Sequence, residues 1–169
     1  PNIVLNGIAL ILTIYIMAPV GSAIVDTMQS NHVTIDGSMS IDDVMAIGQS
    51  IAPPVKKFLS QHTAPGERNF FMRSATAIWP AERVQALQSD DLMVLVPSFM
   101  LSELTRAFQI GFVIYVVFVV TDLIVANVLL ALGMQMISPT TISIPFKLLL
   151  FVMLDGWSVL VHGLVLSYR

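Results

Sequence analysis

An apolar stretch from residue 107 to residue 168 constrains this chain more than any other feature. Its 62 residues carry only three formal charges, on Asp122, Lys147 and Asp155. A charge at the centre of a bilayer costs at least about 3 kcal/mol, so charged side chains in such a stretch usually face protein or water and are commonly functional. We therefore expect the helices of a membrane-associated assembly, buried mostly against other protein.

The composition favours a membrane protein and excludes several kinds of partner. Of the 169 residues, 56% are hydrophobic and only 11% are charged, whereas soluble domains average about 25% charged. The net charge is −3 and no basic run is present, so nucleic acid is not an expected partner. No cysteine is present to form a disulfide framework or a thiolate metal site. Because the chain starts with Pro1 and an apolar run follows at once, we expect a targeting segment or an earlier helix before it.

The distribution of charge predicts three regions. Residues 1–25 have no charged side chain and predict an apolar helix long enough to cross a hydrocarbon layer of about 30 Å, with a kink or an end near Met17 because of Pro19. Residues 26–91 hold thirteen of the nineteen charges and predict a small polar helical domain outside the apolar layer. Residues 92–169 hold the remaining apolar mass. The predicted fold class is all-α, with membrane-associated helical hairpins and a small helical extramembrane insert.

Proline and glycine set the expected helix boundaries. In the polar region, a helix that starts near Ser40 should end at Pro53-Pro54 and a new helix should follow, with two further short helices over 68–77 and 81–87. In the last region, a helix over 101–132 would be about 48 Å long by its rise, longer than one bilayer is thick. Pro97 suggests that this helix starts or bends there.

A turn should follow this long helix and fold the chain into a hairpin. Gly133 is expected to form a left-handed helix cap, and residues 133–138 are expected to form the turn. Residues 140–143 are predicted to be extended. Pro145 suits the first turn of a last helix, predicted from Phe146 to Leu166.

Several charged side chains in the apolar region are candidates for pairs between helices or between subunits. Glu103 and Arg106 are three residues apart and could pair locally, and Lys147 could pair with Glu103 or with Asp155. Pairs of this kind set the register of packed helices. The full candidate set is Glu103, Arg106, Asp122, Lys147 and Asp155.

A proton or ion relay is the alternative function for the same groups. Chains of Asp and His residues inside membranes carry protons in pumps and transporters, and here Asp122, Asp155 and His162 would be the carriers. Asp155 and His162 are one heptad apart on a shared helix face. Too few titratable groups align to favour this proton-coupled transporter over structural pairing.

The predicted turn carries two methionines, Met134 and Met136, on either side of Gln135. Turns normally carry polar residues, whereas methionine is flexible and fills irregular gaps. Repeated around a ring of subunits, such a turn would form a deformable hydrophobic seal across a pore. A turn that simply dips into lipid or against a neighbour is the alternative, and the residues alone favour it. No nucleophile–base pair or metal-ligand cluster is visible, so we expect neither an enzyme nor a cofactor or metal.

Two long runs of sequence resemble a known family. SELTRAFQIGFVIY (102–115) and DLIVANVLLALGMQMISPTTISIPFKLLLFVMLDGW (122–157) closely resemble the FliP/SctR family, whose members are core export-apparatus subunits of flagellar and injectisome type III secretion systems. The phrases SELTRAF, SPTTISIPFKLLLF and HGLVLSY resemble the injectisome branch more than the flagellar one. The resemblance covers nearly the whole chain outside residues 26–91.

The resemblance implies a specific assembly. About five copies would join two smaller export-apparatus subunits (SctS-like and SctT-like) in a spiral of helical hairpins around a central channel in the bacterial inner membrane. A switch subunit (SctU-like) and a large export-gate subunit (SctV-like) would be further partners, and unfolded secreted proteins would pass through. Residues 26–91 would face the periplasm.

The resemblance also assigns a role to the turn. Met134, Gln135 and Met136 would form the gasket that closes the channel, with Gln135 in place of a family methionine, and the charged side chains would form pairs between helices or subunits. Val117 stands where the family often has proline, so a kink expected there is in doubt.

Overall fold

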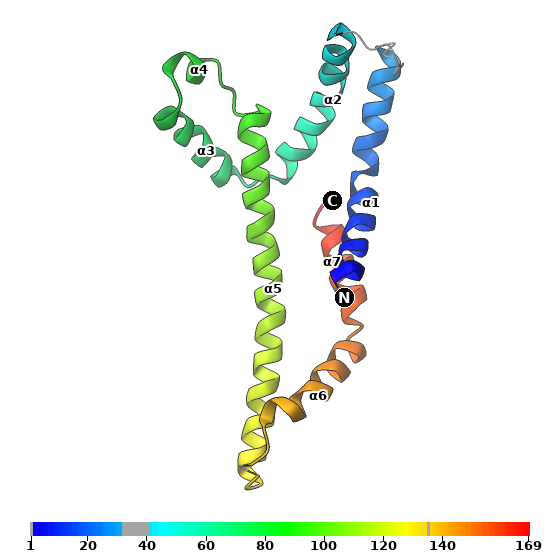
Figure 1. The fold of residues 1–169 in the computed structure, drawn as a ribbon, viewed down its shortest axis with the longest axis vertical. Helices are drawn as coiled ribbons and strands as arrows, with labels where there is room; N and C mark the ends of the chain where they lie inside the picture. Colours follow the sequence, from blue (N-terminus) through cyan, green and yellow to red (C-terminus); the bar gives the residue numbers. More distant parts are fainter. Residues whose placement is uncertain (1, 32–40, 135) are drawn as a thin grey trace. The chain divides into compact units, whose positions relative to one another are not determined.

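The computed structural model describes residues 2–31, 41–134 and 136–169, and every regular element in these ranges is an α-helix (Figure 1). The all-α prediction is therefore confirmed. The chain forms two compact units, Pro1–Leu104 and Thr105–Arg169, and the boundary between them falls inside one long helix, α5 (Leu92–Ala131). Each unit is described separately below.

In the first unit, two long helices, α1 (Asn2–Ser30) and α2 (Ile41–His62), lie side by side (Figure 1). The Asn31 side-chain nitrogen donates a hydrogen bond to the hydroxyl of Ser50, which is fully buried, over a distance of 3.0 Å. This bond joins the end of α1 to the middle of α2. Residues 32–40, which include the predicted helix start at Ser40, lie outside the described part of the chain.

Three prolines that were expected to limit helices in the first unit lie inside them. α1 continues through Pro19 for eleven more residues, and α2 continues through Pro53 and Pro54 to His62. The predicted helix end at Pro53-Pro54 was therefore wrong, and of the kink or end predicted near Met17, the end does not occur. A proline removes one backbone hydrogen bond and costs about 3 kcal/mol in a helix interior, but the mutual packing of α1 and α2 and the contacts of the second half of α2 outweigh that cost.

The second half of α2 packs near the start of α5. The Phe58 and Phe99 rings have centroids 5.9 Å apart, and Lys56 Nζ lies 3.4 Å from Asp91 Oδ1. Asp91 also starts α5, because its carbonyl accepts the amide hydrogens of Val94 and Leu95. α5 therefore begins at Leu92, not at Pro97, and Pro97 lies inside it.

Two short helices, α3 (Pro65–Ile78) and α4 (Ala81–Gln85), complete the first unit and confirm the short helices predicted there. The backbone amide of Ala64, just before α3, donates to the buried hydroxyl of Ser102 on α5 over 2.9 Å. The core of this unit includes Val94, Leu95 and Ser98 of α5, which are almost completely buried.

The second unit is a hairpin made of the rest of α5, the helix α6 (Pro139–Met153) and the helix α7 (Gly156–Leu166) (Figure 1). Gly133 has φ +73°, which confirms the predicted left-handed cap. α6 starts at Pro139, so the prediction of extended backbone over residues 140–143 was wrong. Pro139 directly after Ser138 is the same start signal that had been assigned to Pro145.

The predicted last helix is broken into two. After α6 ends, Asp155 adopts a left-handed conformation with φ +51°, and α7 leaves at 56° to α6. The prediction of one continuous helix over 146–166 was therefore wrong. Close packing at Gly156 explains the break, because a Cβ atom at this position would lie 2.5 Å from Cε2 of Phe151.

Two helices in the described residues, α1 and α5, are long and apolar enough to cross a membrane, and the bent pair α6–α7 would be a third if it acts as one broken span. Almost none of the apolar windows of α1 and α5 is buried within the chain. These surfaces therefore require lipid or other protein to cover them.

Candidate functional site

An ionic cluster joins α5 to α6 inside the hairpin. Lys147 Nζ of α6 lies 2.7 Å from Asp122 Oδ2 of α5, and the hydroxyl of Ser143 donates a hydrogen bond to Asp122 Oδ1. Ser143 and Lys147 are four residues apart on one face of α6, so both reach the same carboxylate. We call these three residues the clamp.

The burial of the clamp differs among its members. Ser143 is completely buried, whereas the side chains of Lys147 and Asp122 are 25% and 33% exposed. Asp122 therefore uses one oxygen to bind a buried hydroxyl and the other to bind a partly exposed cation. Hydrogen bonds to an ionised group are shorter and stronger than those between neutral groups, so this carboxylate links the two helices directly.

The two partners that the sequence suggested for Lys147, Glu103 and Asp155, were both wrong, because Lys147 reaches a carboxylate on the facing helix instead. Lys147 pairs with Asp122 over 2.7 Å, a shorter distance than those from Lys56 to Asp90 and Asp91. Glu103 and Arg106 lie three residues apart on α5, on either side of the boundary between the two units. Asp155 lies at the break between α6 and α7 and makes no ion pair with any described residue.

The three groups considered for a relay are not connected to each other. Asp122 is bonded to Ser143 and Lys147, and no hydrogen bond within the described ranges links it to Asp155 or His162. His162 lies on α7, seven residues after Asp155. Within the described residues, no group of three or more His, Cys, Asp or Glu side chains could hold a metal ion.

The turn between α5 and α6 presents its methionines outward. The backbone amide of Met134 donates to the carbonyl of Leu129 over 3.0 Å, which closes the end of α5 around Gly133. Met134 is 40% exposed and Met136 is fully exposed. Gln135, the third predicted gasket residue, lies outside the described part of the chain. Two exposed methionines at one end of the hairpin are therefore available to contact other molecules.

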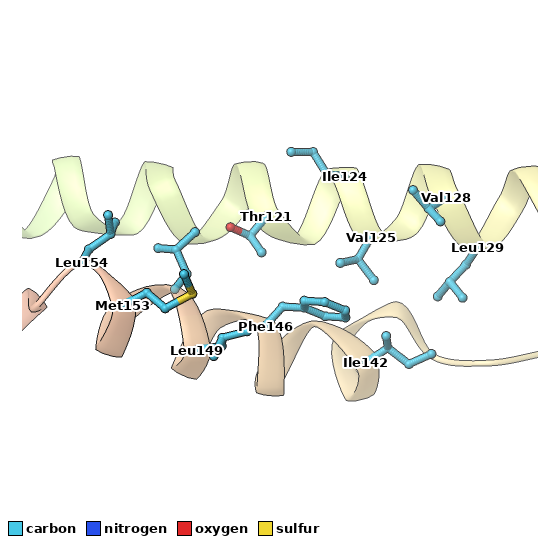
Figure 2. A pocket seen from close by; sticks show the side chains of 11 residues that line it. Thr121, Ile124, Val125, Val128, Leu129, Ile142, Phe146, Leu149, Met153 and Leu154 are labelled. Carbon is cyan, nitrogen blue, oxygen red and sulfur yellow. The ribbon is translucent and has the colours of Figure 1, made fainter.

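An open apolar pocket of about 710 Å³ separates α5 and α6 beside the clamp (Figure 2). Val125 and Leu129 point from α5 toward α6, and the ring of Phe146 lies between the two helices (Figure 2). The clamp is thus the polar contact in a part of the hairpin whose other contacts are apolar. Apolar contacts alone do not define the register of two helices, but a directional hydrogen bond does.

Sequence reasoning missed Ser143 and the contact between Gly156 and Phe151. The spacing of four residues between Ser143 and Lys147 was the available signal for the first, because it places both on one helix face. No local pattern marks the second, because a serine, a glycine or a phenylalanine in an apolar helix is common.

The fold and the site define a membrane-protein subunit with an apolar helical hairpin, large uncovered apolar surfaces and a partly buried polar contact between helices. Comparison with known proteins then gives the family. The FliP family profile matches residues 1–164, and the chain belongs to this family, as the resemblance predicted.

Curated relatives match along the whole chain. It is 51% identical to the hypersensitivity response secretion protein HrcR of Ralstonia nicotianae, with 100% of this chain and 77% of the relative covered. It is 50% identical to the Yop proteins translocation protein R of Yersinia pestis, over 99% of this chain and 76% of the relative. The flagellar biosynthetic protein FliP of Bacillus subtilis is 40% identical, over 99% of this chain and 72% of the relative. Identity is thus higher to the secretion and translocation proteins than to the flagellar one.

Proposed function

We propose that this chain is a structural subunit of a type III secretion export apparatus, and that it forms, with copies of itself and with smaller partner subunits, the entrance channel for unfolded proteins. The support is its membership of the FliP family and its 51% and 50% identity to proteins named for secretion and translocation. Its role is to build and close a channel, and it performs no catalysis.

The uncovered apolar helices are the observation that carries this proposal. α5 has 40 residues and is about 60 Å long by its rise, whereas the hydrocarbon layer is about 30 Å thick. Even a strongly tilted α5 extends beyond the lipid, and its exposed apolar side chains there need protein as cover. Neighbouring subunits supply that cover in a ring or spiral of hairpins. The cover comes from about five copies of this chain and from SctS-like and SctT-like subunits, next to SctU-like and SctV-like proteins.

In this assembly, Met134 and Met136 of each copy form a flexible seal across the channel. Their exposure and their position at one end of the hairpin support this role. Methionine side chains adapt to one another and exclude water, and they yield when a polypeptide passes. The polar region over residues 26–91 faces the periplasm, and the assembly lies in the bacterial inner membrane.

Replacing both methionines with alanine tests the seal. In the Met134→Ala/Met136→Ala variant, the closed channel should conduct ions several-fold more than the parent protein, because the shorter side chains leave a wetted gap. The measurement is the conductance of the purified complex in planar bilayers. The variant Met93→Ala, which removes another exposed methionine far from the turn in sequence, is the control and should leave the conductance unchanged. Unchanged conductance in the double variant, with the complex intact, would remove the seal from the proposal.

A further inference from the structure

The methionine turn is held at both of its ends by contacts within the hairpin. At its start, Gly133 has φ +73° and the amide of Met134 is bonded to the carbonyl of Leu129. At its end, the hydroxyls of Ser138 and Thr140 are 2.7 Å apart, where α6 begins. The position of the exposed methionines therefore depends on where α6 starts relative to α5.

Ser143 links the start of α6 directly to α5. It lies in the first turns of α6, is completely buried, and its hydroxyl lies within hydrogen-bond distance of Asp122 Oδ1 on α5 and 3.1 Å from the carbonyl oxygen of Thr140. A hydroxyl carries one hydrogen, and the ionised carboxylate is the stronger acceptor. The short serine side chain thus links the backbone of α6 to the carboxylate on α5.

Lys147 does not supply the same constraint. It binds the other oxygen of Asp122, but its four-carbon stem is flexible and its ammonium group can rotate among acceptors. Its side chain is also partly exposed. Lys147 balances the charge of Asp122, whereas Ser143 is the shorter and less flexible link between the two helices.

We propose that Ser143 is a positioning residue for the methionine seal: its hydrogen bond to Asp122 sets the height of the turn, so that Met134 and Met136 of every copy meet at one level. This inference rests on the proposed function. A ring closes only when all copies present the same side chain at the same depth, so a small slip of α6 in each copy opens the seal although every methionine remains.

The test compares Ser143→Ala with Thr141→Ala. Thr141 lies two residues away, and its exposed side chain makes no hydrogen bond to any described residue, so its variant controls for the loss of a hydroxyl in the same turn. The conductance of the purified complex and the yield of assembled complex are both measured. Ser143→Ala should raise the conductance per complex several-fold with the yield maintained, and Thr141→Ala should change neither. Ser143→Cys, which keeps a donor on a slightly larger side chain but donates a weaker hydrogen bond, should give an intermediate conductance.

A combined variant separates positioning from a general structural role. If Ser143 acts through the methionines, Ser143→Ala should add no further conductance to Met134→Ala/Met136→Ala. The inference would be overturned if the conductance increases of the two variants added up in the combined variant. It would also be overturned if both Ser143 variants lost assembled complex in parallel with their increase in conductance. If the methionine variant leaks and Ser143→Ala does not, this inference fails and the seal stands. If the methionine variant does not leak, the seal itself fails.

Discussion

At the scale of single residues, the pairing of Asp122 with Lys147 explains how charges are tolerated in an apolar hairpin. The two groups come from different helices, and Lys147 Nζ lies 2.7 Å from Asp122 Oδ2. Because their charges are opposite, the pair has no net charge. Removing one partner leaves the other uncompensated, which destabilises far more than removing both. This asymmetry distinguishes a structural pair from a proton carrier.

We therefore predict the effects of three clamp variants. Asp122→Asn and Lys147→Met should each lower the yield of assembled complex several-fold, because each leaves one charge without its partner. The double variant Asp122→Asn/Lys147→Met should recover part of that yield, because no uncompensated charge remains. The measurement is the amount of intact complex after detergent extraction and size-exclusion chromatography.

Export activity decides between this role and the relay. A relay through Asp122 would leave the complex of Asp122→Asn assembled but inactive in export, and the double variant would stay inactive. An intact, export-dead complex of Asp122→Asn would therefore contradict the structural assignment. His162→Gln serves as the control, because this second candidate carrier should be dispensable for export if no relay exists.

At the scale of helices, the corner between α6 and α7 is fixed by side-chain packing. The Phe151 and Trp157 rings meet edge to face, with centroids 5.5 Å apart and planes at 90°. Gly156 leaves room for the Phe151 ring, and Asp155 supplies the left-handed turn. Edge-to-face aromatic pairs add about 0.5–1.5 kcal/mol beyond the area they bury, so the corner is a stable feature of the hairpin.

Gly156→Ala should disturb this corner. The added Cβ would displace the Phe151 ring from Trp157, and we expect a loss of stability of about 1–3 kcal/mol, typical of overpacking. Trp157 reports the change through its fluorescence in a Trp79→Phe background, which leaves it as the single tryptophan of the chain. Thermal unfolding of the complex gives the stability.

Two further variants make the result specific. Gly163→Ala adds a methyl group to the same helix where nothing lies within 4 Å, and it should leave both the fluorescence and the thermal midpoint unchanged or raise the midpoint slightly. Gly156→Ala/Phe151→Leu should recover part of the loss, because the smaller side chain makes room. A Gly156→Ala complex as stable as its parent would show that the packing does not fix the corner.

At the scale of the whole molecule, the chain has more apolar surface than it can cover by itself. α1 and α5 are both long enough to cross a membrane, and hardly any of their apolar windows is buried within the chain. A single chain in detergent would expose these surfaces to acyl tails, whereas an assembly would bury them between subunits. Association is therefore the expected state of the functional protein.

Native mass measurement of the detergent-extracted complex tests this expectation. We predict a main species that contains several copies of this chain together with smaller subunits. A main species corresponding to one chain, whose 169 residues have a mass of 18.5 kDa, would contradict the channel proposal. A dilution series in the same detergent is the control, because an obligate assembly should keep its mass while a nonspecific association should not.

The amino-acid sequence alone was sufficient to predict the all-α class and the backbone features that depend on neighbouring residues. The apolar run predicted the long helices, Gly133 predicted the left-handed cap, and the local pattern predicted two separate short helices over 68–77 and 81–87. These features depend on hydrophobicity, on the freedom of glycine at positive φ and on the missing amide hydrogen of proline, all of which are readable from neighbouring residues. The family could also be recognised from the sequence, because the resemblance extends over long runs of residues.

Packing between distant parts of the chain, by contrast, controls which helices continue through proline and which charged side chains pair. α2 passes through Pro53 and Pro54 because its second half packs near the start of α5, and the predicted last helix breaks because a phenylalanine ring occupies the space beside Gly156. Lys147 meets Asp122, 25 residues earlier in the chain, because the turn at Gly133 brings α6 back along α5. Each outcome depends on contacts between residues distant in sequence, and such contacts leave no periodic pattern along the chain.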